Sequence, residues 1–195
     1  MENLSLFDAH VHLNWFKNPE QAAAQAQKLG IAALCCTVTP KEYRDASALL
    51  SKCPNVRVAA GIHPWLVDDS TDAADVADAI SGSPWVGEIG LDFGAKHAHS
   101  KKEQLRVFEE ACEACSEGGK TLSIHSVRSA GAVMDVLERT GTIDSCPSVF
   151  HWFSGTSEEL ARAREAGCWF SVGERMLGTR RGREYARQIP SGRLL

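Results

Sequence analysis

The stretch LFDAHVHL, residues 6–13, places two histidines two positions apart inside an otherwise apolar run. If the stretch is a β-strand, its side chains alternate between two faces, one of which is apolar. The other face carries three ionisable side chains, those of Asp8, His10 and His12. Because side chains at positions i and i+2 point the same way, His10 and His12 can hold one metal ion, with Asp8 as a supporting residue.

Short apolar runs alternate with helical patterns along the rest of the chain. The expected strands are residues 5–13, 31–38, 56–62, 85–91, 121–125, 148–152 and 168–172. The expected helices lie in residues 19–30, 41–53, 72–81, 101–119, 129–141 and 156–167. Four of these helices are expected to end at Gly30, Gly118, Gly141 and Gly167, and the last to begin at Thr156 or Ser157.

This alternation predicts an α/β fold in which helices cover a parallel sheet. Two architectures fit, an open doubly wound sheet and a closed (β/α) barrel. The first strand is followed by no glycine-rich fingerprint, which weakens the dinucleotide-binding form of the open sheet. No repeat or linker marks a boundary, so residues 1–195 are expected to form a single domain.

Composition narrows the class of protein. The apolar fraction of 44% and the charged fraction of 24% are ordinary for a globular enzyme, and the net charge of −4 confines any phosphate-binding site to a local patch. The start of the chain lacks the pattern of a signal peptide and no stretch has the length of a membrane span, so a cytoplasmic protein without membrane contact is expected. The seven cysteines are expected to be reduced and mostly buried, including the pair in CEAC, residues 112–115.

Polar residues fall at the carboxyl ends of the expected strands. They are His10, His12, His63, His125 and His151, with Glu88 inside the fourth strand. A single such histidine is more often structural, but in a parallel α/β fold these ends face one opening, where active sites are built. A buried Glu88 costs several kcal/mol unless it is paired. Imidazole and carboxylate donors suit a divalent cation such as Zn²⁺, Mn²⁺, Fe²⁺ or Ni²⁺, and Glu88 can bridge to a second ion.

The motifs FDAHVHL, GIHPW, GEIGLDF, LSIHSVRSAG and FHWFSGT occur in that order. Together they resemble the TatD family of metal-dependent hydrolases, within the amidohydrolase-like barrel superfamily. The resemblance runs from residue 6 to residue 195. It implies a (β/α) TIM-type barrel that binds two divalent metal ions (Zn, Mn, Mg, Ni or Fe). It also implies a deoxyribonuclease-like enzyme that cleaves phosphodiester bonds with a metal-activated water.

The resemblance also implies roles for individual residues. His10 and His12 would hold one metal ion, His125 and His151 the other, with Glu88 as the bridging, catalytic carboxylate. His63 would line the pocket and touch the scissile phosphate, as a catalytic and substrate-binding residue. Asp92 would be a supporting or substrate-facing residue, and His97 and His99 would lie in a solvent-exposed loop. Family members carry an arginine two residues after the fifth-strand histidine, whereas here Arg128 follows His125 by three, and it is the candidate for phosphate binding.

The C-terminal region sets a further expectation. In the family an eighth strand with a metal-binding aspartate follows a segment like IPSGRLL, and here the count is seven strands plus the start of an eighth, a C-terminally incomplete barrel. The first metal site is then expected to bind more weakly. The first and seventh strands are expected to have unpaired edges through which the chain self-associates. The last six arginines (Arg175, Arg180, Arg181, Arg183, Arg187 and Arg193) form either a solvated helix face or a basic lip for phosphate.

The sequence thus predicts a TatD-like hydrolase whose partner is DNA or a small phosphodiester substrate. One alternative keeps the metals but changes the substrate to an amide, ester or lactone, because fold and ligands do not separate these chemistries. The other is a metal-binding but catalytically impaired fragment.

Overall fold

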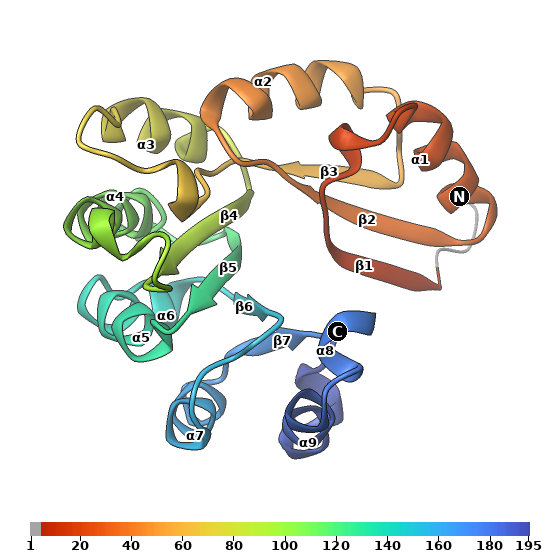
Figure 1. The fold of residues 1–195 in the computed structure, drawn as a ribbon. Helices are drawn as coiled ribbons and strands as arrows, with labels where there is room; N and C mark the ends of the chain where they lie inside the picture. The colour runs from red at the N-terminus through yellow and green to blue at the C-terminus, as the bar shows by residue number, and fades with distance from the viewer. Residues whose placement is uncertain (1–4) are drawn as a thin grey trace.

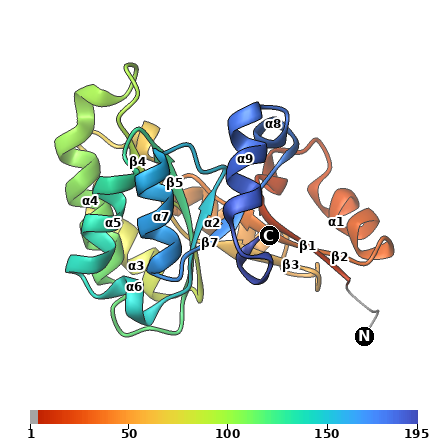
Figure 2. The ribbon, with the colours of Figure 1, turned by 90° about the horizontal axis from the view of Figure 1, so that it is seen from below.

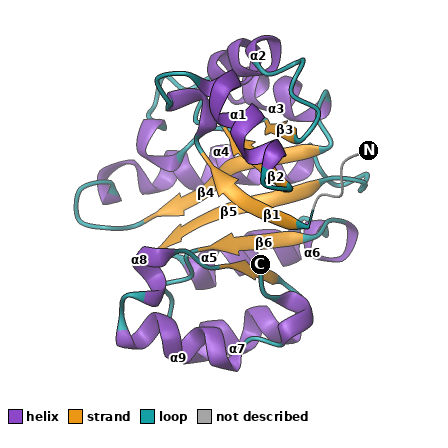
Figure 3. Cartoon of the chain, turned by 90° about the vertical axis from the view of Figure 1, so that its right-hand side faces the viewer, coloured by secondary structure: helices purple, strands orange, loops and turns teal. Residues whose placement is uncertain are grey.

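Seven parallel strands form the centre of the protein, whose computed structural model describes residues 5–195. The strands are β1 (Leu6–Val11), β2 (Ile31–Cys36), β3 (Val56–Ala59), β4 (Trp85–Asp92), β5 (Thr121–Val127), β6 (Ser148–His151) and β7 (Trp169–Ser171). They pair in the orders β1-β2-β3 and β4-β5-β6-β7, and a parallel bridge between Ala60 and Val86 joins the two groups. Figure 1 shows the strands following one another in chain order, and in Figure 3 β4, β5 and β6 point the same way.

Helices lie outside the strands, as Figures 1 and 2 show. They are α1 (Pro19–Lys28), α2 (Pro40–Leu49), α3 (Ala73–Ser81), α4 (Lys101–Glu113), α5 (Ala130–Arg139), α6 (Thr142–Ser145), α7 (Ser157–Glu165), α8 (Glu174–Leu177) and α9 (Arg180–Gln188). Short 3₁₀ turns span Leu13–Trp15, Pro64–Leu66, Ala98–Ser100 and Ser191–Arg193. None of the helices in the described residues is both long and apolar enough to cross a bilayer.

Three of the four expected helix ends are confirmed, those at Gly30, Gly141 and Gly167. The end expected at Gly118 is wrong, because α4 ends at Glu113 and Gly118 follows in the turn. Gly30, Gly118, Gly141 and Gly167 all have φ between 71° and 81°, the left-handed region that favours glycine. Thr156 caps α7, and its side chain and that of Glu159 each accept a hydrogen bond from the other's backbone N–H.

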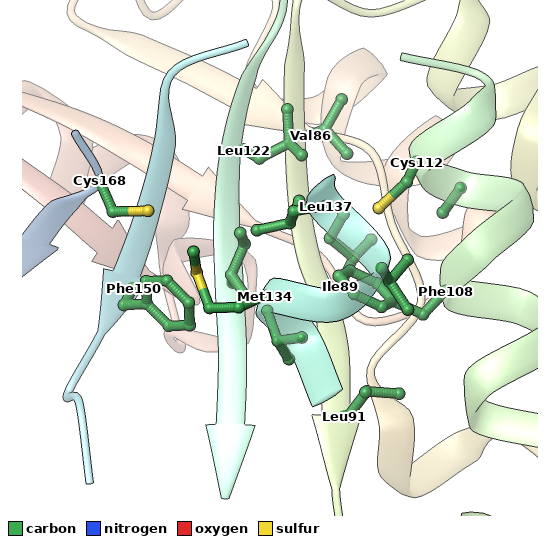
Figure 4. Close-up of a cluster of buried hydrophobic side chains, with 14 of the residues drawn as sticks. Val86, Ile89, Leu91, Phe108, Cys112, Leu122, Met134, Leu137, Phe150 and Cys168 are labelled. Atoms are coloured by element: carbon green, nitrogen blue, oxygen red, sulfur yellow. The ribbon is translucent and has the colours of Figure 1, made fainter. Parts of the chain in front are cut away.

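The main core lies between β4–β7 and the helices outside them. Figure 4 shows Phe108 and Leu137, from α4 and α5, on the side of β4 that carries Ile89, with Met134 beside Phe150 of β6. All five side chains are buried. The seven cysteines are free, and six of them are buried. Burial raises the pKa of Cys115 and Cys168 to about 12, so these thiols serve as apolar filling, as predicted.

The start of an eighth strand is also confirmed. Leu194 forms a parallel bridge with Phe170, and the N–H of Leu195 donates to the carbonyl of Phe170 at 2.8 Å. The prediction of an unpaired edge on β7 is therefore wrong, because this C-terminal segment occupies it. Along the other end of the sheet, β1 pairs with β2 on one edge, and its second edge has no strand partner within residues 5–195.

Candidate metal centre

Glu88 is the point on which the polar strand ends converge. The carboxylate is 2% exposed, and five histidine rings, which lie in or just after β1, β3, β5 and β6, surround it. Its Oε2 lies 3.3 Å from Nε2 of both His10 and His12. Its Oε1 lies 3.1 Å from Nε2 of His63, 2.8 Å from Nδ1 of His125 and 3.1 Å from Nε2 of His151. The structure thus brings together all six residues that the sequence placed at one opening.

Two glycines let neighbouring strands approach Glu88 closely. A Cβ on Gly61 would lie 2.6 Å from the carbonyl oxygen of Glu88, and a Cβ on Gly90 would overlap the carbonyl oxygen of His125. Gly90 also has φ +135°, a backbone conformation that side-chain-bearing residues rarely adopt. Gly61, which follows β3, and Gly90, in the motif GEIG, therefore allow Glu88 to lie between the ends of β3 and β5, within reach of the histidines on both sides.

Hydrogen bonds to Nδ1 orient the first pair of histidines. Nδ1 of His12 lies 2.9 Å from the carbonyl oxygen of Cys36, which can only accept a hydrogen bond. Neutral His12 therefore carries its proton on Nδ1 and turns the lone pair of Nε2 toward Glu88. Nδ1 of His10 lies 2.8 Å from the hydroxyl of Ser123. The Nε2 atom of His10 therefore faces Oε2 of Glu88, the oxygen that Nε2 of His12 also faces.

His125 lies between two carboxylates. Its Nδ1 faces Glu88, and its Nε2 lies 3.1 Å from Oδ2 of Asp92. Asp92 is buried and also accepts hydrogen bonds from Nε1 of Trp65 at 2.6 Å and from the backbone N–H of Gly94 at 2.7 Å. Asp92 therefore orients His125 from behind, the arrangement found where a carboxylate supports a metal-binding imidazole.

His63 and His151 differ in how their second nitrogen is used. Nδ1 of His63 accepts the backbone N–H of Trp65 at 3.1 Å, so the neutral ring carries its proton on Nε2, facing Glu88. That atom is a hydrogen-bond donor and has no lone pair to offer a cation. His151 stacks on His10 with 3.8 Å between ring centroids, and its buried Nδ1 has no hydrogen-bond partner among the described residues.

The pKa shifts follow from burial against the charge of Glu88. Burial opposes ionisation of Glu88, but hydrogen bonds from the histidines outweigh it and hold its pKa well below the usual range. For His12 and His125 burial is likewise outweighed by the contact with Glu88, and their pKa values are raised. Desolvation lowers the pKa of His63, and that of His151 to about 4.

This donor set fits divalent cations. Ligand atoms of His10, His12 and Glu88 lie within 4.8 Å of one another. Atoms of His63, Glu88 and His125 lie equally close, but the neutral His63 ring presents its N–H there and not a lone pair. A buried carboxylate ringed by imidazole nitrogens is the mixture of donors that borderline divalent metals bind.

The centre forms the floor of a pocket of about 800 Å³. Trp15, Trp65 and Trp152 line this pocket together with Arg175 of α8. The three tryptophans were not predicted as site residues. Each follows a histidine of the centre by one to three residues, and this spacing is the signal that could have identified them.

Other predicted residues lie elsewhere. Arg128 is exposed, with φ 54°, and is not among the residues that line the pocket. His99 is exposed as expected, but the expectation of solvent exposure is wrong for His97, which is half-buried and stacks on Trp65 with centroids 4.9 Å apart. Arg181 is exposed, as a solvated face predicts, and it also hydrogen-bonds the carbonyl of Gly155 and the hydroxyl of Tyr185.

Comparison with known proteins gives a consistent result. The family model described as TatD related DNase matches residues 7–195. Two similar curated proteins are named 3'-5' ssDNA/RNA exonuclease TatD. The one from Erwinia billingiae is 30% identical over 97% of this chain and 77% of its own length. The one from Dickeya dadantii is 29% identical over 97% and 76%.

Solved structures show the same fold. The TatD homologue YJJV from Escherichia coli K12 superposes with a TM-score of 0.84 and 23% identity, covering 97% of this chain and 77% of its own. A TatD family hydrolase from Entamoeba histolytica gives a TM-score of 0.82 at 18% identity, covering 97% and 71%. The (β/α) barrel predicted from the sequence is therefore confirmed, and the open doubly wound sheet is excluded.

Proposed function

Because the chain belongs to the family of TatD-related DNases, we propose that it is a metal-dependent hydrolase of phosphodiester bonds in single-stranded nucleic acid. The observation that carries the proposal is the convergence of five imidazoles on the buried carboxylate of Glu88. The names of the curated relatives supply the class of substrate. The barrel supports the proposal by opening this centre to a pocket at the carboxyl ends of its strands.

We assign two cations to the centre, one held by His10, His12 and Glu88, the other by Glu88, His125 and His151. His151 is chosen over His63 because no hydrogen bond to its Nδ1 forces the ring proton onto Nε2, so that Nε2, which faces Glu88, can act as a ligand. Bound cations would lower the pKa of a coordinated water and stabilise negative charge on the phosphate. The nitrogen-rich donor set favours Zn²⁺, Mn²⁺, Ni²⁺ or Fe²⁺ over Mg²⁺.

The remaining residues act on the substrate or on the ligands. The N–H at Nε2 of His63 is a donor on the pocket floor and would hydrogen-bond an oxygen of the scissile phosphate. Asp92 holds the ring of His125 through Nε2. Arg175, at the pocket wall, is the cation positioned for a neighbouring phosphate, a role that the sequence analysis gave to Arg128. The seven free cysteines support a reducing compartment such as the cytoplasm.

A hydrolysis panel with one matched variant tests the proposal. The metal-stripped protein is supplied with Mn²⁺, Zn²⁺ or Mg²⁺ and given a single-stranded oligonucleotide, an aryl phosphodiester, an aryl ester and a lactone. We expect metal-dependent cleavage of the first two, and loss of at least a hundredfold in kcat/KM in Glu88→Gln, which keeps the shape of the side chain but removes its charge.

Each other outcome identifies a rival. Turnover of the ester or lactone without cleavage of the phosphodiesters would assign the centre to acyl chemistry. Equal background in the wild type and in Glu88→Gln, with metal still bound by the wild type, would leave a metal-binding protein without catalysis.

A further inference from the structure

The exposed tryptophans of the protein gather at one place. The chain has five tryptophans. Trp15, Trp65 and Trp152 are 60%, 55% and 46% exposed, and all three line the pocket above Glu88. Trp85 and Trp169 are half-buried and do not line it. Exposed aromatic side chains that share one pocket mark a ligand surface rather than scattered surface residues.

Two of these indoles are fixed in position, each by a hydrogen bond from its ring N–H and by a histidine that stacks on one of its faces. Trp15 stacks on His12 with 4.2 Å between centroids, and its N–H donates to Glu42. Trp65 stacks on His97, and its N–H donates to Asp92. Because the polar N–H groups are already satisfied, each indole presents an apolar ring face to a ligand. Such fixed rings lose little conformational entropy when a partner stacks on them.

Trp152 is presented by an uncommon backbone. Its φ is +46°, in the left-handed region that residues other than glycine seldom adopt. Its backbone N–H donates to the carbonyl oxygen of Ser171 at 3.0 Å. Such conformations are retained at functional sites when the surrounding structure determines them. The residue directly follows His151, so this backbone directs the indole to the pocket wall beside the centre.

We propose that Trp15, Trp65 and Trp152 form a stacking mouth that holds unpaired nucleobases next to the scissile phosphate. This inference rests on the proposed nuclease function and deepens it. Flat ring faces suit bases better than acyl chains, and Arg175 supplies the cation that the backbone phosphate between stacked bases requires. Stacking on indoles tolerates any base, so the mouth selects unpaired strands without reading their sequence. Bases paired in a duplex have their faces covered and do not fit.

The test compares oligonucleotides with and without bases. Metal-free protein is titrated, by fluorescence anisotropy, with a short labelled oligothymidylate and with an abasic oligomer of the same length and charge. We expect the wild type to bind the oligothymidylate at least fivefold more tightly, the lower end of what one stacked base supplies. In Trp152→Ala this preference shrinks, and in Trp152→Phe, which keeps a ring face, most of it remains.

Matched controls separate stacking from damage to the fold. Trp169→Phe lies outside the pocket and leaves the preference unchanged. If Trp152→Ala does not fold by circular dichroism, Trp15→Ala and Trp152→Phe carry the comparison. Equal affinity of the wild type for both oligomers overturns the inference, as does an equal loss for both in Trp152→Ala. If the protein supplied with metal hydrolyses the oligothymidylate, but the metal-free protein binds both oligomers with equal affinity, the proposed function stands and the stacking mouth fails. If neither oligomer is bound or cleaved, both proposals fail.

Discussion

Asp92 accepts two side-chain hydrogen bonds on one oxygen, from His125 and Trp65, and a backbone N–H on the other. An amide cannot reproduce this, because one of its two ends donates and would face an N–H. We expect Asp92→Asn to weaken metal binding at the His125 side of the centre by about 10- to 100-fold, leaving the His10 side unchanged. Isothermal titration calorimetry with Mn²⁺ measures both.

Asp8 provides the matched control for that variant. It is exposed, and within residues 5–195 it accepts only the backbone N–H of His10, at 3.2 Å, so Asp8→Asn is expected to leave both affinities within about twofold. Equal affinities in Asp92→Asn and the wild type would show that Asp92 does not position His125.

Protons compete with cations at the centre. Burial disfavours the charged forms of His12 and His125, but contact with Glu88 outweighs it and raises their pKa values above 6.5. A raised pKa means that these rings hold their proton to a higher pH than an ordinary imidazole does, and a ring must lose that proton to bind metal. Metal affinity is therefore expected to rise with pH through the neutral range, with protons released on binding. Calorimetry in buffers of different ionisation enthalpy counts these protons, and a pH-independent affinity would contradict the assignment.

At the scale of elements, the junction of β4 and β5 depends on the absence of a side chain at Gly90. A Cβ there would overlap the carbonyl of His125, and φ is +135°. We expect Gly90→Ala to lower the free energy of unfolding by about 1–3 kcal/mol, measured by urea denaturation. Gly82→Ala is the control, since its φ is −77° and a Cβ would meet its nearest atom at 3.8 Å. Equal stability of the two variants would mean that the strands do not need this close approach.

Elements with strong local signals could be predicted from the sequence. Seven strands and six helices follow from apolar runs, amphipathic periods and glycine ends, and each is present. The one-turn helices α6 and α8 were not predicted, because four residues carry no readable period. The 3₁₀ turns that carry Trp15 and Trp65 escaped for the same reason, and with them the pocket wall. The helix α9 was anticipated only as one of two interpretations of the C-terminal arginines.

The sequence could predict the site residues that lie at the ends of strands. It could not predict the roles that depend on contacts between side chains. Alternation and parallel pairing place His10, His12, Glu88, His125 and His151 at one opening. His63 acts as a hydrogen-bond donor and not as a metal ligand because the backbone N–H of Trp65 donates to its Nδ1. No spacing in the sequence indicates this hydrogen bond. The exposure of Arg128 and the approach of Arg175 likewise depend on how the chain turns after β5 and β7.

At the scale of the whole molecule, one edge of β1 is unpaired within residues 5–195. Leu6 and Phe7 are 62% and 45% exposed, and the edge of β1 away from β2 has no strand partner in the part of the chain described. Exposed apolar edge strands pair with other chains. We therefore expect concentration-dependent self-association in sedimentation velocity, reduced in Phe7→Lys. Leu29→Lys changes an equally exposed leucine outside the strands and should leave it unaltered. A wild type that stays monomeric at high concentration would contradict this expectation.

The barrel as a whole serves to bring residues from four strands onto Glu88. The most direct test of that centre is the anomalous difference map of a crystal grown with Mn²⁺. We predict one peak within bonding distance of Glu88, His10 and His12, and a second within bonding distance of Glu88, His125 and His151. His63 is expected to lie outside bonding distance of both. No peak at Glu88, or unchanged peaks in Glu88→Gln, would contradict the account.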